Sequence, residues 1–232
     1  MTELKQLRED KSKKIKDRGI FMGEYQFTNA VTSKEELREL LGTPSEMVQN
    51  KVINYLDEHC RSFISKSPFI VVSTTDKAGK TDVSPKGDKS GFVHILNDHQ
   101  LVIPERKGNR RADTMMNILE NPYMGVIFFI PGFGEMLRVN GRATLIRDED
   151  ILDKMAVNGK SPKFGIAVNV EECFIHCAKA TIRSGLWKQE TWPDKETLPW
   201  AAQILADHAK ICGRKAEDID AGLKLGYTKD LY

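Results

Sequence analysis

The chain has 232 residues, enough for one large domain or two small ones. Its composition, 40% hydrophobic and 29% charged with a formal net charge of +2, is that of a globular protein without a general attraction for nucleic acid or anionic membranes. The first residues are charged and lack the apolar stretch of a signal peptide, and the longest apolar run, residues 124–130, is too short to cross a bilayer. We therefore expect a cytoplasmic protein.

The N-terminal part of the chain has a polar and helical pattern. Residues 1–30 are expected to form a polar arm or a frayed helix. Two capping boxes follow, at residues 33–36 and 43–46. Apolar residues then recur at intervals of about 3.6 between residues 47 and 63, which predicts a single packing helix.

From residue 68 onward the pattern becomes that of strands separated by turns. A bulge or tight bend is expected at Asn140 and Gly141. About six strands joined by short turns favour a mostly antiparallel barrel with helices at both ends, rather than alternating βαβ units. The extended segments are residues 69–75, 81–88, 91–96, 100–104, 123–130, 135–146 and 164–177, and helices are expected over residues 112–119, 148–157 and 198–211, with a further helical piece at the C-terminus.

Four cysteines are present, and without an export signal we expect them to be reduced thiols. Cys173 and Cys177, with His176 beside the second of them, suggest a metal site. This spacing lacks the second ligand pair that zinc normally needs, and thiols packed in a strand are the alternative. No metal site is predicted.

The segment of residues 105–111 (ERKGNRR) carries the clearest chemistry. It places four cations, a glycine and an asparagine where a strand gives way to a helix N-terminus. Outward backbone amides and the positive end of the helix dipole collect an anion there, and Arg side chains hold phosphate with two hydrogen bonds. We interpret the segment as a phosphate cradle. The alternative is a solvated cationic helix start.

Residues 82–88 (DVSPKGD) and 103–111 (IPERKGNRR) resemble the pyridoxamine 5′-phosphate oxidase-like superfamily of FMN-binding split barrels, and more closely its subgroup of FMN-dependent enzymes. The resemblance covers about residues 43–192. It implies a fold that is mainly β with flanking helices, a six-stranded antiparallel split β-barrel, and a homodimer with FMN at the subunit interface. We expect a charged helical arm over residues 1–42, the FMN-binding domain over 43–192, and a helical extension over 193–232 packed on the barrel.

The resemblance also assigns cofactor contacts. The strand before the cradle would run along the isoalloxazine ring, the next strand's end would lie against the flavin, the cradle would hold the phosphate, and the second subunit would close the site. The residues implied are, in that order, Val83, Ser84, Pro85 and Lys86; Ile103 and Pro104; Arg106, Asn109, Arg110 and Arg111; and His176, Lys179, Arg183 and Trp187. From sequence context alone, His176 fits a satisfied histidine and Trp187 a packing residue.

The resemblance implies an FMN-dependent oxidoreductase that transfers a hydride between the flavin and an unidentified small substrate. Pyridoxamine phosphate oxidases carry an Arg-Leu-His-Asp-Arg run near the C-terminus. The nearest stretch here, residues 182–187 (IRSGLW), lacks that His and the paired Arg, so oxidation of vitamin B6 is not expected. The alternatives are a flavin-binding carrier or sensor without turnover, and the same barrel binding deazaflavin F420 or haem, with His176 as axial ligand. No catalytic residue is predicted.

Overall fold

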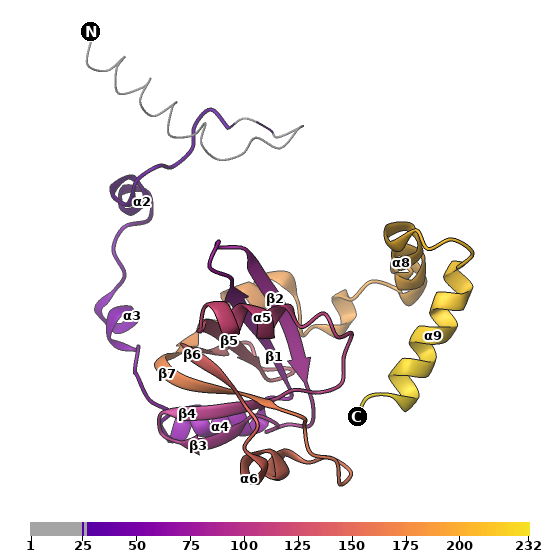
Figure 1. Cartoon of the computed structure of the whole chain (residues 1–232). Coiled ribbons are helices and arrows are strands. Elements are labelled where there is room, and N and C mark those ends of the chain that lie inside the picture. Colours follow the sequence, from indigo (N-terminus) through magenta and orange to yellow (C-terminus); the bar gives the residue numbers. More distant parts are fainter. Residues whose placement is uncertain (1–24, 26) are drawn as a thin grey trace. The chain divides into compact units, whose positions relative to one another are not determined.

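The computed structural model describes Tyr25 and residues 27–232 (Figure 1). It forms two compact units, of which the first ends at Ser45 and the second spans Glu46–Tyr232. Most of the predicted N-terminal arm lies outside the described residues. In the first unit, helix α2 (Lys34–Leu41) begins after Ser33, whose side chain accepts a hydrogen bond from the backbone of Glu36 at 3.1 Å. The predicted capping box is confirmed in part: Ser33 is the N-cap, but the Glu36 carboxylate accepts the backbone N–H of Thr32, at 3.0 Å, in place of that of Ser33.

The second unit is built on one antiparallel sheet of seven strands in the order β2-β1-β5-β6-β7-β4-β3 (Figure 1). Each predicted extended segment forms a strand, so the mainly β class with flanking helices is confirmed. The predicted count of six strands is wrong, because all seven segments pair with a neighbouring strand. The short edge strand β3 pairs with β4 alone. The strands are β1 (Phe69–Thr75), β2 (Thr81–Gly87), β3 (His94–Asn97), β4 (Gln100–Pro104), β5 (Tyr123–Phe129), β6 (Met136–Ile146) and β7 (Gly165–His176).

The core lies along the buried face of the sheet, where alternate residues of the strands are fully enclosed, as Val126 and Phe128 are on β5. The register of the β6–β7 pair shifts between Asn140 and Gly141, which confirms the predicted bulge. A Cβ atom at Gly141 would lie 2.0 Å from the backbone oxygen of Asn169. Only glycine therefore allows the two strands to approach at this point.

Two short helices, and not one, occupy the segment that the 3.6-residue periodicity predicts as a single helix. Helix α3 (Glu46–Asn50) ends before Ile53, whose backbone pairs with Cys173 of β7 in an isolated antiparallel bridge. Helix α4 (Glu58–Lys66) begins anew after Asp57, whose carboxylate accepts the backbone N–H of Cys60 at 2.8 Å. That hydrogen bond lowers the pKa of Asp57. The single-helix prediction is wrong because periodicity carries no information about pairing with a strand far along the chain.

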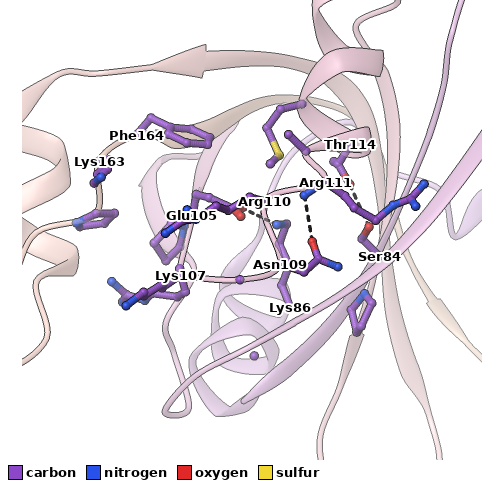
Figure 2. Close-up of a pocket in the computed structure, with 18 of the residues that line it drawn as sticks. Ser84, Lys86, Glu105, Lys107, Asn109, Arg110, Arg111, Thr114, Lys163 and Phe164 are labelled. Carbon is purple, nitrogen blue, oxygen red and sulfur yellow. Dashed lines mark hydrogen bonds and ion pairs between the residues drawn. The ribbon is translucent and has the colours of Figure 1, made fainter. Parts of the chain in front are cut away.

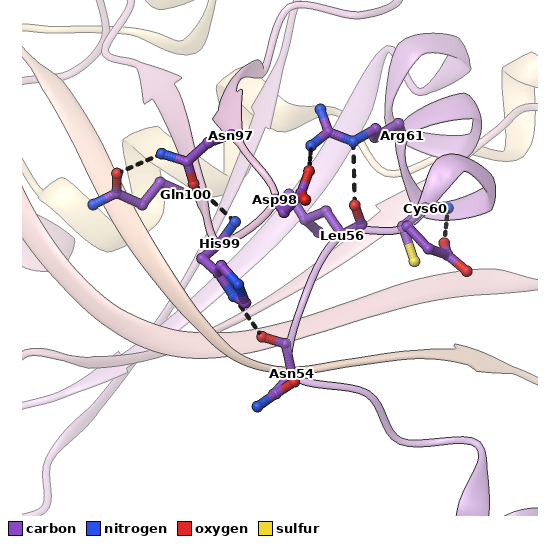
Figure 3. Close-up of polar contacts among 9 residues, drawn as sticks. Asn54, Leu56, Cys60, Arg61, Asn97, Asp98, His99 and Gln100 are labelled. Carbon is purple, nitrogen blue, oxygen red and sulfur yellow. Dashed lines mark hydrogen bonds and ion pairs between the residues drawn. The ribbon is translucent and has the colours of Figure 1, made fainter.

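The connection between α3 and α4 is fastened to the turn between β3 and β4 (Figure 3). The backbone N–H of Leu56 donates to the carbonyl of Asp98 at 2.6 Å, and a ring nitrogen of His99 lies 3.1 Å from the carbonyl of Asn54. Arg61 of α4 pairs with the Asp98 carboxylate and donates to the Leu56 carbonyl. These contacts fix α4 against the sheet edge.

Helix α5 (Asp113–Glu120) packs against β1, β2 and β6, and it is the helix that shapes the site. The helices predicted around residues 112–119, 148–157 and 198–211 and at the C-terminus are confirmed, whereas α7 lies in a segment for which no helix was predicted. No helix in the described part of the chain is long and apolar enough to cross a membrane. The remaining helices are α6 (Glu149–Leu152), η1 (Asp153–Met155), α7 (Lys179–Ser184), η2 (Gln189–Thr191), η3 (Lys195–Thr197), α8 (Ala201–Ala209) and α9 (Ala216–Lys229), of which α8 and α9 pack against each other.

Candidate functional site

A cleft of about 1060 Å³ is formed by β2, the end of β4, the segment leading into α5, and the loop of residues 160–164 before β7 (Figure 2). Ligand sites in proteins commonly enclose about 300–1,000 Å³, so this cleft has room for a nucleotide-sized molecule. Its lining combines charged residues with the apolar side chains of Phe92, Phe164 and Tyr232.

Strand β2 presents alternate residues to one side, which places Asp82, Ser84 and Lys86 in a row. The Asp82 carboxylate accepts hydrogen bonds from the hydroxyl of Ser84 at 2.9 Å and from that of Thr114 at 2.6 Å. Thr114 lies in the first turn of α5 and is almost fully buried. This hydroxyl–carboxylate cluster fixes the start of α5 against β2.

The segment between β4 and α5 has the local features of an anion site. Arg110 and Ala112 adopt left-handed backbone conformations, with φ of 64° and 61°, which are costly for residues other than glycine. No side chain within the described ranges caps the start of α5. Asn109 accepts the backbone N–H of Arg111 at 3.0 Å and so tightens the turn. The first amides of α5 are thus left without a capping side chain, next to two arginines.

The cations that line the cleft differ in how their charge is balanced. Arg111 pairs with Asp113 at 2.7 Å, and this carboxylate raises the pKa of Arg111. Lys86 pairs with Glu105 at 2.5 Å, and both side chains are largely buried. Arg110 forms no ion pair or side-chain hydrogen bond with any residue that the structure describes. Its guanidinium is the cation of the cradle that is free to meet a ligand.

Arg106 has a buried partner and lines the cleft. Its side chain donates to the carboxylate of Asp88 at 2.6 Å and to the carbonyl of Met155 at 2.9 Å. The hydroxyl of Tyr232 donates to the other oxygen of Asp88 at 2.8 Å. Burial opposes ionisation of Asp88, but the hydrogen bonds from Tyr232, from the Lys89 backbone and from Arg106 outweigh it and lower its pKa. The negative charge of Asp88 therefore balances Arg106 inside the protein.

The structure brings together most of the residues assigned to the cofactor. Ile103 is fully buried in the core and does not line the cleft. Those that line it are Val83, Ser84, Pro85, Lys86, Pro104, Arg106, Asn109, Arg110 and Arg111.

The four residues assigned to the second subunit lie outside the cleft of their own chain. His176 ends β7 beside Phe174, and burial together with Arg138 and Lys51 lowers its pKa. Lys179 and Arg183 belong to α7. The indole nitrogen of Trp187 is buried without a hydrogen-bond partner among the described residues. Their role toward a cofactor of the other subunit stays a prediction.

Sequence reasoning missed several residues of the cleft. The alternation along β2 that predicts Ser84 and Lys86 on one face also includes Asp82, so this residue could have been found. Lys163, Phe164 and Tyr232 come from distant parts of the chain, and no local pattern marks them.

The structure gives no support to a metal site at Cys173 and Cys177. Cys173 is buried in the core with its sulfur 3.3 Å from that of Cys60, whereas Cys177 is exposed. Among the residues that are described, no group of three or more His, Cys, Asp or Glu side chains is placed to hold a metal ion.

The fold and the cleft define a mainly antiparallel β protein of the split-barrel class with a cleft lined by several cations. The family model described as pyridoxamine 5′-phosphate oxidase matches residues 56–177, and the chain belongs to this family. A search of curated proteins found no significant match.

Solved structures with similar folds each align with about half of this chain. HupZ of Group A Streptococcus is 18% identical, with 51% of this chain and 92% of HupZ covered and a TM-score of 0.42. For a putative pyridoxamine 5′-phosphate oxidase of Lactobacillus delbrueckii the identity is 23%, the coverage 53% and 95%, and the TM-score 0.41. For general stress protein 26 of Bacillus anthracis these values are 17%, 49% and 88%, and 0.39.

Proposed function

We propose that the cleft binds FMN and that the protein is an FMN-dependent oxidoreductase. The observation that carries the proposal is the start of α5 in a chain of the pyridoxamine 5′-phosphate oxidase family. There Arg110, which has no partner among the described residues, stands beside a helix N-terminus that none of these residues caps with a side chain. A phosphate dianion would supply the negative charge that balances both the Arg110 guanidinium and the positive end of the α5 dipole.

The residues present fit the rest of an FMN molecule as well. The cleft is large enough for a flavin nucleotide, and its lining changes from the cationic segment of residues 109–111 to the hydroxyls and carboxylate of Ser84, Thr114 and Asp82. Phe92 and Pro104 add apolar surface. Phosphate, polyol and ring each have groups of suitable chemistry within one cleft.

When bound, FMN supplies reversible hydride and electron transfer. In our proposal the chain holds and orients the cofactor: Asn109, Arg110 and Arg111 hold the phosphate, while the Lys86–Glu105 pair places a balanced charge near the other end of β2. Among the described residues that line the cleft, we assign no acid or base. The substrate is proposed to be a small molecule.

We further propose a homodimer in which the second chain closes the cleft. Four of the residues implied by the resemblance, His176, Lys179, Arg183 and Trp187, lie outside the cleft of their own chain. The buried indole N–H of Trp187 has no acceptor within the described part of the chain. In this proposal the FMN-binding domain comprises residues 43–192, which include the family match, and residues 193–232 form an added helical extension.

The visible absorbance of the purified protein tests the proposed chemistry. We expect flavin bands that bleach on anaerobic reduction with NADPH or dithionite and return in air, and a deazaflavin or haem would give a different spectrum. A Soret band, a deazaflavin band, or no chromophore after incubation with FMN would contradict the proposal. Bleaching by dithionite alone would leave FMN binding intact and favour the flavin-binding carrier over an NADPH-dependent enzyme.

A further inference from the structure

Positive charge in the cleft is not confined to the proposed phosphate cradle. Its lining includes seven Lys or Arg side chains and three Asp or Glu side chains. Four of the seven cations have carboxylate partners in the structure, which are Lys86 with Glu105, Arg106 with Asp88, Lys107 with Asp230 and Arg111 with Asp113.

Three lining cations have no ion pair or side-chain hydrogen bond to any part of the chain that is described. One is Arg110, which belongs to the proposed phosphate cradle. The other two are Lys160 and Lys163, which lie on the loop between η1 and β7. Exposed lysines on a loop are usually solvated, but these two line the same cleft as the cradle.

The loop that carries the two lysines has a defined conformation. Val157 and Lys160 pair through both backbone hydrogen bonds around a turn in which Asn158 and Gly159 have positive φ. The loop is joined to the start of the cradle segment, because the backbone N–H of Glu105 donates to the carbonyl of Phe164 at 3.2 Å. The lysines are therefore held at a fixed side of the cleft.

Lys163 and Phe164 lie across the cleft from Ser84, Arg111 and Thr114, with the segment that carries Glu105 and Arg110 between the two groups (Figure 2). A phosphate held by Asn109 to Arg111 would thus leave the lysine side of the cleft for a different anion. The half-buried ring of Phe164 and the buried Pro162 provide apolar surface next to it.

We propose that Lys160 and Lys163 form a second anion subsite, which binds the carboxylate or phosphate group of the substrate. This inference rests on the proposed function, since it assumes that the cradle is taken by FMN. Two ammonium groups attract an anion without requiring the planar, two-hydrogen-bond geometry of a guanidinium. The ring of Phe164 favours a substrate in which an unsaturated or aromatic group is attached to that anion. The substrate class is therefore a small organic anion with an apolar ring or chain.

Calorimetric titration of the FMN-loaded protein with phenyl phosphate, benzoate and neutral benzyl alcohol tests the subsite. We expect at least one of the two anions to bind and benzyl alcohol not to bind. The double variant Lys160→Ala, Lys163→Ala should lose at least tenfold in anion affinity and keep its FMN affinity within twofold. The matched control is Lys77→Ala, Lys80→Ala, which removes two exposed lysines of the same spacing from the turn between β1 and β2 and should change neither affinity.

Three results would overturn the subsite. They are absence of anion binding to the wild-type protein, equal anion affinity in the lysine variant, and a parallel loss of FMN affinity, which would make the lysines part of the cofactor site. If the protein does not bind FMN at all, the same titrations are run on the protein as purified. Loss of anion binding in the lysine variant would then keep the subsite while the FMN proposal fails.

Discussion

The double variant Arg110→Ala, Arg111→Ala is expected to bind FMN at least about 100-fold more weakly than the wild-type protein. Each arginine removed takes away a charged hydrogen-bond donor, worth about 1.5–3 kcal/mol, and each 1.4 kcal/mol corresponds to about tenfold in affinity. Both arginines lie in the segment before α5, and only Arg111 has a carboxylate partner among the described residues, Asp113. Fluorescence titration of FMN gives the two dissociation constants.

The fold should survive this double change. Arg111 is exposed, and its pair with Asp113 is a solvent-screened surface pair that contributes little to stability. A suitable control is Arg147→Ala, Arg214→Ala, which removes the same charge at exposed positions outside the cleft. Unchanged FMN affinity in a folded double variant would rule out the cradle. An equal loss of FMN affinity in the control variant would show that the net charge of the protein, and not the two arginines of the cradle, governs FMN binding.

The second large effect is expected at Asp88. Asp88→Ala should lower the free energy of unfolding by about 3 kcal/mol at neutral pH, because it leaves the buried guanidinium of Arg106 without its counter-ion. The side chains of Asp88 and Arg106 are only 2% and 17% exposed. The variant also removes the acceptor of the Tyr232 hydroxyl. Urea unfolding followed by circular dichroism measures the change.

The effect at Asp88 should depend on pH in a defined direction. Its pKa is lowered in the folded protein, so its stabilising contribution is complete above the ordinary carboxyl pKa of about 3.9 and is lost as the pH falls through the lowered value. The difference between wild type and variant should therefore shrink in acid. As a control, Asp98→Ala breaks the pair between Asp98 and Arg61, whose two side chains are 68% and 36% exposed, respectively. This variant should lower the free energy of unfolding by about 0.5 kcal/mol. A cost at Asp88 no larger than at Asp98 would contradict the account.

The strands could be read from the sequence because each carries its own local signal. β1 is a run of β-branched residues, and the bulge at Asn140 and Gly141 is marked by two residues that favour such geometry. The prediction of a single helix over residues 47–63 is wrong because the contact that interrupts it is made with a distant part of the chain. Its apolar spacing is helical, but the backbone of Ile53 is taken by Cys173, a partner that no local pattern predicts.

The cleft shows the same division between local and long-range information. Asn109, Arg110 and Arg111 stand together in sequence, so a cation-rich turn before a helix could be identified directly. Arg106 is paired, whereas Arg110 has no partner among the residues that the structure describes. This difference could not be predicted, because it depends on Asp88 and Tyr232 lying beside Arg106 in the folded chain. The lysine loop opposite the cradle is likewise brought to the cleft by the pairing of β4 with β7.

The most direct test of the central proposal is a titration of the wild-type protein with FMN, followed by flavin fluorescence and by the absorbance of the bound fraction after gel filtration. The account predicts saturable binding with one FMN per chain and competition by inorganic phosphate at the cradle. A protein that is folded, and yet retains no FMN and shows no change in flavin fluorescence, would contradict the assignment of the cleft as a flavin site.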